Sequence, residues 1–294
     1  MIYFIATGNV LLEVYAMTIR EEAYMGRPVS AFVVDSHTHI SPYYMSGWYE
    51  TPKLTGNGAI VSMMDRLGID RIVTAPHYLV LGMMERANIS ACEAAKMFPG
   101  RIYGYISVCP GEDLGIIRNE LERYKKDPSF LGLKFLPGYH GQITQDGYSY
   151  ALDFADEMRC PVLIHTWGGS PPLSDIGAIA AKRHRMKLLC AHQGGGSAAF
   201  SNKLAEIMKD HPNLYMELCG SLNNTLSVED LVSLVGGDRL IYGSDLINLD
   251  PRYDLGRVIF STLSDETKKK VLAENYLEIL KDSQMGKISN LSRG

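Results

Sequence analysis

The chain has 294 residues, of which 46% are hydrophobic and 21% are charged, so it can bury a sizeable core. Its formal net charge of -4 argues against nucleic acid or an anionic membrane as the main partner. Five scattered cysteines without a C-x-x-C pair predict reduced, buried thiols in a cytoplasmic protein and exclude a disulfide framework.

Residues 1–30 form an apolar extension ahead of the regular pattern. The stretch "MIYFIATGNVLLEVYAM" lacks a basic first segment and is interrupted by Glu13, which disfavours a secretory leader. A pair of strands turning at Gly8-Asn9 is expected instead. The extension is a candidate packing surface or homodimer contact. No uninterrupted apolar run is long enough to cross a bilayer.

Apolar strand segments alternate with amphipathic helical segments across residues 31–281. The expected strands are "FVVDSHTH", "RIVTAP", "YGYISV", "LGLKFLP", "PVLIHT", "KLLCAHQ", "NLYMELCG" and "RLIYGSD". Between them, runs such as "EDLGIIRNELERYKKD" repeat apolar residues at helical spacing. Eight such repeats predict an α/β protein, a (β/α)8 TIM barrel. An open doubly wound sheet is the alternative, but "DSHTHISP" lacks the Gly-rich turn usual after its first strand.

The segments around the strands complete the prediction of a single domain. "LSDETKKKVLAENYLEIL" is the expected closing helix, with Ser264 as its N-cap. The polar tail, residues 282–294, is expected to fray. The connection from Ser41 to Asn57 contains three tyrosines and Trp48, which makes it a candidate lid over the barrel mouth.

Polar side chains stand at the carboxyl ends of several expected strands. His37 and His39 alternate at the end of the first strand, His165 ends the fifth, His192 ends the sixth and Asp245 ends the eighth. The carboxyl ends of barrel strands share one rim, so these side chains are expected to converge. A lone histidine at a strand end is usually not a ligand, but their joint arrangement indicates a metal site.

The cost of burial favours a metal at this rim. Several imidazoles and a carboxylate in an apolar funnel are expensive to bury unpaired, and a divalent cation offsets that cost by taking their lone pairs. Nitrogen and oxygen ligands with a position left for water suit Zn²⁺. Ligand type alone leaves Mn²⁺, Fe²⁺ and Co²⁺ open.

The stretches "DSHTH", "PVLIHT", "AHQGGG" and "YGSD" resemble the amidohydrolase superfamily, specifically the amidohydrolase-related branch with aminocarboxymuconate-semialdehyde decarboxylase-like enzymes. The resemblance spans roughly residues 31–281. It implies that one divalent metal ion is bound by His37, His39, His165 and Asp245. Asp245 would also accept a proton from the attacking water, and His192 would stabilise charge on the substrate oxygen.

Other polar residues near the rim are candidates for further roles. Two-metal members of the superfamily carry a carboxylated lysine on the fourth strand, so Lys134 would serve a second metal only if it were carboxylated; one metal is favoured. His77 and His140 follow strands two and four, where they would touch substrate, and Trp167 is a candidate pocket wall. Asp35 is expected to support the site from below and not to bind the metal.

The expected activity is hydrolysis of an amide, ester or lactone bond in a small molecule by a metal-activated water. The alternative is non-oxidative decarboxylation of a small unsaturated or aromatic acid, which needs a cation to grip a carboxylate; Arg252, Lys53 and Arg86 are candidates. A barrel that binds a metal-chelating ligand without turnover is disfavoured, because every expected ligand position holds a competent residue.

Overall fold

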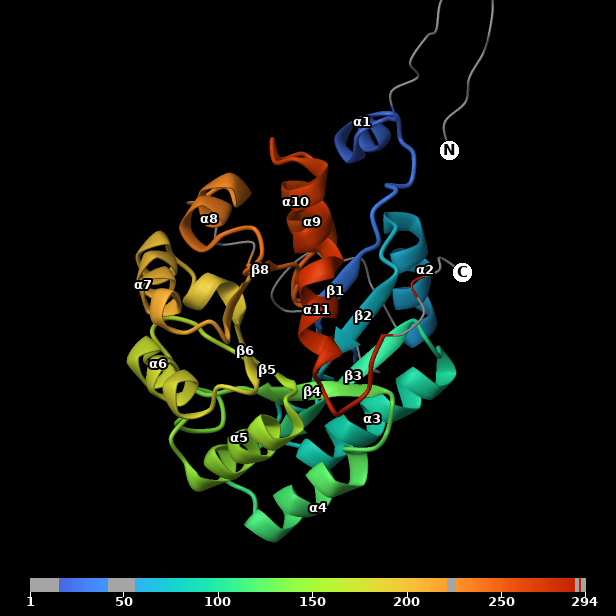
Figure 1. Cartoon of the computed structure of the whole chain (residues 1–294). Coiled ribbons are helices and arrows are strands. Elements are labelled where there is room, and N and C mark those ends of the chain that lie inside the picture. The colour runs from blue at the N-terminus through green and yellow to red at the C-terminus, as the bar shows by residue number, and fades with distance from the viewer. Residues whose placement is uncertain (1–15, 42–55, 221–225, 289–290, 292–294) are drawn as a thin grey trace, which may run out of the picture.

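Eight parallel strands form one sheet in sequence order in the computed structural model, which describes residues 16–41, 56–220, 226–288 and 291. Helices surround the sheet (Figure 1). The strands are β1 (Val34–Thr38), β2 (Arg71–Thr74), β3 (Ile102–Val108), β4 (Phe130–Phe135), β5 (Pro161–Ile164), β6 (Lys187–Cys190), β7 (Leu214–Glu217) and β8 (Leu240–Ile241). The eight-stranded barrel expected from the sequence is confirmed.

Backbone hydrogen bonds bring the last strand segment against the first. Ser36 N donates to Tyr242 O at 3.2 Å, and Asp245 N donates to His37 O at 2.8 Å. Ile247 N donates to His39 O at 3.2 Å. Residues more than two hundred positions apart therefore meet at one seam, and this seam carries the polar rim.

The connecting helices bury one face each against the strands. In α4, Ile117, Leu121 and Tyr124 are buried, and the Asp113 side chain caps the first turn by accepting from Gly115 N. The helices that follow β1 to β7 are α2 (Asn57–Leu67), α3 (Met84–Met97), α4 (Leu114–Tyr124), α5 (Asp146–Met158), α6 (Leu173–Lys182), α7 (Ala198–Asp210) and α8 (Val228–Val235).

The segment after β8 closes the barrel. It contains α9 (Pro251–Ile259), α10 (Asp265–Lys269), η2 (Lys270–Glu274) and α11 (Asn275–Lys281). Ser264 caps α10 by accepting from Thr267 N, as expected from the sequence. Side chains of α11 join a cluster that takes single residues from most strands, including Val34 and Tyr105, and that fills the barrel below the rim.

Two terminal segments differ from the sequence-based expectation. Residues Ile19–Tyr24 form a helix, α1, where strands were expected, because Thr18 and Glu21 make a capping box at its start. The expected turn at Gly8-Asn9 lies outside the described residues. The tail does not fray over residues 282–288: Met285 and Ile288 are buried, and Gly286 N donates to Phe130 O at 2.9 Å.

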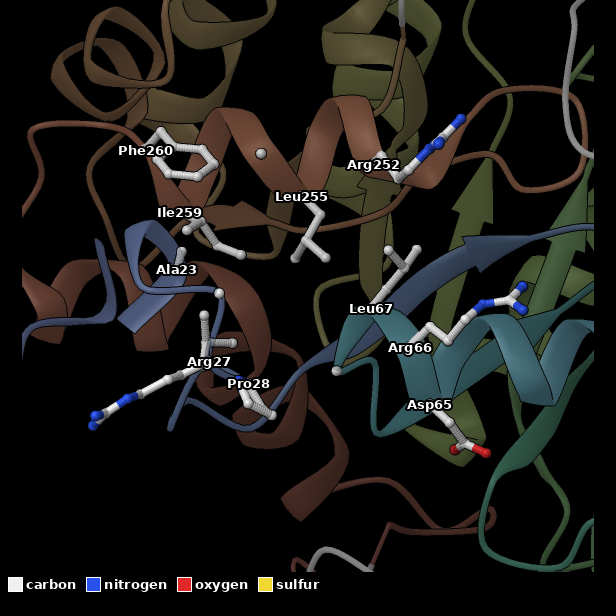
Figure 2. Close-up of a pocket in the computed structure, with 14 residues that line it drawn as sticks. Ala23, Arg27, Pro28, Asp65, Arg66, Leu67, Arg252, Leu255, Ile259 and Phe260 are labelled. Atoms are coloured by element: carbon white, nitrogen blue, oxygen red, sulfur yellow. The ribbon is translucent and has the colours of Figure 1, made fainter. Parts of the chain in front are cut away.

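A cavity of about 360 Å³ lies between α1, the end of α2 and α9 (Figure 2). Leu67, Leu255 and Ile259 line it together with Arg66 and Arg252, whose charged ends point outward. The described residues that line this cavity include neither histidine nor cysteine. It is therefore separate from the polar rim.

Within the described residues, no helix combines the length and the apolar character that crossing a bilayer requires.

Candidate active site

Three of the four expected metal ligands meet at the carboxyl end of the barrel. His37 lies in β1, His39 follows that strand and Asp245 follows β8. These side chains are buried, with 1%, 3% and 8% of their residue surfaces exposed. One ligand atom from each lies within 4.8 Å of the other two. The barrel therefore places two imidazoles and one carboxylate around a common point.

The backbone at the end of β8 directs Asp245 toward the histidines. Asp245 has a positive φ of 57°, a left-handed conformation that non-glycine residues adopt at a cost. Its Oδ1 atom lies 3.2 Å from His39 Nε2 and 3.8 Å from His37 Nε2. Gly243 permits the close approach of the strands, because a Cβ atom there would lie 2.2 Å from Glu217 Oε1.

Hydrogen bonds behind the two rings determine which nitrogen faces the carboxylate. His39 Nδ1 lies 2.6 Å from Ala75 O, which can only accept, so Nδ1 carries a proton and Nε2 faces Asp245. His37 Nδ1 lies 3.1 Å from Glu217 Oε2, which leaves Nε2 toward the site. Lone pairs on facing nitrogen and oxygen atoms need a proton or a cation between them. The donor set therefore fits a divalent cation.

The electrostatics of the site favour the metal-binding protonation states of His37 and Asp245. Burial and the charge of Lys134 lower the pKa of His37 well below its ordinary value. Burial acts to raise the pKa of Asp245, but the imidazoles of His39 and His37 beside it hold that pKa well below its usual range. Neutral imidazoles and an ionised carboxylate are the forms that coordinate divalent ions.

Lys134 places a buried cation in the same cluster. Its side chain comes from β4 and is fully buried, and Nζ lies 2.7 Å from His37 Nε2. Burial lowers the pKa of Lys134 to about 8, and the neighbouring carboxylates of Asp245 and Glu217 oppose this shift. The sequence identified this residue, but its contact with His37 follows only from the fold.

His165 and His192 form a second pair beside the first cluster. His165 follows β5 and is half-buried, and its Nδ1 atom lies 3.0 Å from His192 Nε2. His192 lies in the turn η1 (Ala191–Gly194) with a φ of 54°. Two groups of three possible ligands contain His37, one with His39 and Asp245 and one with His192 and Cys219, and His165 belongs to neither. Its role as a fourth ligand stays a prediction.

Sequence reasoning missed two buried residues of this site, Glu217 and Cys219. Glu217 ends β7 and accepts from His192 N at 3.2 Å. Cys219 Sγ lies 3.0 Å from Glu217 Oε2 and 3.1 Å from His192 Nδ1. In "YMELCG" these two residues alternate with Met216 and Leu218, and this alternation was the signal that could have placed them inside the barrel.

Two exposed aromatic side chains flank the histidine pair. Tyr139 is 57% exposed, and its ring centroid lies 5.2 Å from that of His165 in an edge-on arrangement. Trp167 is 38% exposed and meets His192 edge-on at 5.5 Å. These rings offer flat apolar surfaces beside the cluster.

The remaining expected residues lie at different distances from the site. His77 is buried and stacks on His39, with 5.5 Å between ring centroids. His140 lies 3.6 Å from Cys109 Sγ and outside the cluster. Asp35 is fully buried and accepts from Ser244 N at 3.0 Å, which suits its expected supporting role.

The cations proposed to grip a carboxylate are mostly engaged elsewhere. Arg252 pairs with Asp250, and its side chain is largely exposed. Arg86 lies over the ring of Tyr78 at 5.4 Å. Lys53 and residues 42–55 of the candidate lid lie outside the described residues.

A model of the amidohydrolase family matches residues 34–280. An uncharacterised TIM-barrel protein from Bordetella bronchiseptica is similar with a TM-score of 0.70 and 14% identity, covering 85% of this chain and 98% of that one. A dihydroxybenzoic acid decarboxylase from Polaromonas, solved with bound manganese and 2-nitroresorcinol, is similar with a TM-score of 0.67 and 15% identity. The match covers 85% of this chain and 97% of that one. A 5-carboxyvanillate decarboxylase from Sphingomonas paucimobilis is similar with a TM-score of 0.66 and 11% identity, over 86% of this chain and 99% of that one. No curated protein matches the chain.

Proposed function

The chain belongs to the amidohydrolase family, and from its site we propose that it is a metal-dependent decarboxylase of a small aromatic or unsaturated carboxylic acid. The observation that carries the proposal is the convergence of His37 Nε2, His39 Nε2 and Asp245 Oδ1 beside the buried ammonium of Lys134. The solved decarboxylases of the same fold support the choice of reaction.

One divalent cation is proposed at this point, held by His37, His39 and Asp245, with His165 as the fourth ligand. A cation bound there would act as a Lewis acid toward a substrate oxygen. We propose Zn²⁺ from the nitrogen and oxygen donors, with Mn²⁺ as the alternative supported by the manganese in the Polaromonas structure.

The charge distribution favours an anionic substrate. Lys134 is a buried cation in the cluster, whereas Arg252 and Arg86 have other contacts. A carboxylate near Lys134 would give this ammonium a second partner and reduce its cost of burial. Tyr139 and Trp167 would pack against a planar substrate at the rim.

The reaction requires one proton at carbon. The bond between the carboxylate carbon and its neighbour breaks, CO₂ leaves, and the electron pair stays on the neighbouring carbon until a proton reaches it. We propose that Asp245 and His192 carry this proton, because Asp245 is the carboxylate of the proposed ligand set and His192 is the imidazole paired with His165.

Hydrolysis of an amide, ester or lactone is the second candidate. The ionised form of Asp245, which its low pKa favours at neutral pH, suits a base that takes a proton from water. Both reactions use the same residues. Identifying the products therefore distinguishes decarboxylation from hydrolysis, which the positions of the residues do not.

The test compares products from metal-loaded protein supplied with hydroxybenzoates, small unsaturated acids, lactones and amides. Decarboxylation in D₂O would release CO₂ and place one deuterium at the carbon that lost it. Asp245→Asn should lower the rate by about 10²–10⁴-fold. Asp250→Asn is the matched control, because Asp250 lies on the same loop and caps α9, and asparagine also caps helices.

Two results would overturn the proposal. Formation of an acid from a lactone or amide without CO₂ would replace decarboxylation by hydrolysis. Binding of acids without turnover by any loaded form, unchanged in Asp245→Asn, would indicate a binding protein.

A further inference from the structure

The side chains of Asp245, Asn248 and His77 are joined in series by two hydrogen bonds. Asn248 Nδ2 donates to Asp245 Oδ1 at 3.0 Å. Asn248 Oδ1 lies 2.7 Å from His77 Nε2. Asp245 and Asn248 follow β8, and His77 follows β2. The two hydrogen bonds therefore link the segments that follow the two neighbours of β1.

The negative charge of Asp245 determines which group donates in each of the two hydrogen bonds. An ionised carboxylate only accepts, so the Asn248 amide must present its NH₂ group to Asp245 and its oxygen to His77. His77 Nε2 must then carry a proton, and Nδ1 must be bare. The tautomer of His77 is thereby fixed by a carboxylate that it does not touch.

His77 Nδ1, the ring nitrogen that does not contact Asn248, is buried without a hydrogen-bond partner among the described residues, which destabilises the protein. The whole residue is 5% exposed. A buried acceptor without a partner is destabilising, because it has given up its hydrogen bond to water. A phenylalanine ring could also stack on His39 without that cost, so the Nε2–H donor to Asn248 is the feature that an imidazole adds.

We infer that Asn248 and His77 are positioning residues for the proposed metal site. Asn248 holds the Asp245 carboxylate with Oδ1 toward His37 and His39, and His77 holds the Asn248 amide in the orientation that allows this. The inference rests on the proposed site but not on the reaction. Outer partners that orient metal ligands typically contribute 10–100-fold in affinity or activity.

Calorimetric titration of full-length metal-free protein with Zn²⁺ and with Mn²⁺ tests the pair. Asn248→Ala should weaken binding by about 10–100-fold. His77→Phe should also weaken it, whereas His77→Gln, whose amide NH₂ replaces the Nε2–H donor, should bind close to the wild-type affinity. His140→Phe is the matched control, because His140 lies on the same rim outside the chain of bonds, and should leave the Kd unchanged.

Comparing His77→Gln with His77→Phe shows whether His77 acts through its hydrogen-bond donor or through the packing of its ring. If His77→Gln binds metal as weakly as His77→Phe, the ring and not the donor matters, and the inference is wrong. An unchanged Kd in folded Asn248→Ala overturns it as well. Near-wild-type melting temperatures of the metal-free variants show that a loss of affinity is local.

A spectroscopic measurement covers the case in which a variant does not fold. Nitrogen NMR of imidazole-labelled wild-type protein should show the proton of neutral His77 on Nε2, and a proton on Nδ1 would contradict the chain. Absence of any metal binding by wild-type protein would refute the proposed function itself, a result distinct from unaltered binding in Asn248→Ala.

Discussion

His37 and Glu217 lie 180 positions apart in the sequence, yet His37 Nδ1 and Glu217 Oε2 are 3.1 Å apart. Both side chains are buried, the first from β1 and the second from β7. A carboxylate behind a ligand imidazole fixes its tautomer and raises its basicity, so β7 supports a proposed ligand that β1 provides.

Glu217→Leu should weaken Zn²⁺ or Mn²⁺ binding by about 10–100-fold, because His37 would lose the acceptor that keeps Nε2 bare. Glu217→Gln should lose less metal affinity, since the glutamine amide oxygen can still accept a hydrogen bond from His37 Nδ1. Calorimetric titration measures both constants. Equal affinity in wild type and a folded Glu217→Leu variant would show that the contact does not orient the ligand.

Lys134→Met should bind one metal ion per chain with unchanged or higher affinity. The lysine ammonium and a metal ion compete for the lone pair of His37 Nε2, and methionine removes the competitor while retaining much of the buried volume. Elemental analysis of wild type and variant gives the count. Two ions in wild type and fewer in the variant would instead indicate a carboxylated Lys134 that bridges two metals.

The sequence predicted the barrel because its signals are local. Each strand is a short apolar run, and helices such as α4 bury residues at the spacing that the sequence displays. The end segments were harder to predict. Thr18 and Glu21 form their capping box outside the repeated pattern, and Ile288 is one of few apolar residues in a polar tail.

The site was predictable only where its residues stand at strand ends. His37, His39 and Asp245 follow directly from that rule. Contacts across the barrel depend on how strands are staggered, and β1 and β4 both contain register shifts in their pairing. For this reason the sequence indicated neither the partner of Lys134 nor the supporting role of Glu217.

Native protein should react with less than one equivalent of a thiol reagent at neutral pH, and protein in concentrated guanidinium chloride should expose five thiols. The five cysteines are buried and unpaired. Burial also raises the pKa of Cys92, and that of Cys109 to about 12, which suppresses the reactive thiolate. A spectrophotometric thiol count at several pH values measures this. Fewer than five thiols after denaturation would indicate a disulfide.

Tyr105→Phe should destabilise the protein more than Tyr276→Phe. The Tyr105 hydroxyl donates to Ser36 O at 2.9 Å and lies 2.8 Å from the Tyr276 hydroxyl, all inside the barrel. Tyr105→Phe leaves both partners buried without that bond and should cost about 1–3 kcal/mol, whereas Tyr276→Phe leaves the bond to Ser36 intact and should cost about 0.5–1.5 kcal/mol.

Urea unfolding gives the two free energies on one scale. Tyr24→Phe is the control, because Tyr24 is 65% exposed and surface substitutions usually change stability by less than about 0.5 kcal/mol. The hydroxyl of Tyr105 is the branch point of this network only if its removal is the costlier change. A larger loss in Tyr276→Phe would mean that the bond from Tyr105 to the β1 backbone contributes little and that α11 depends chiefly on the Tyr276 hydroxyl to hold its place below the site.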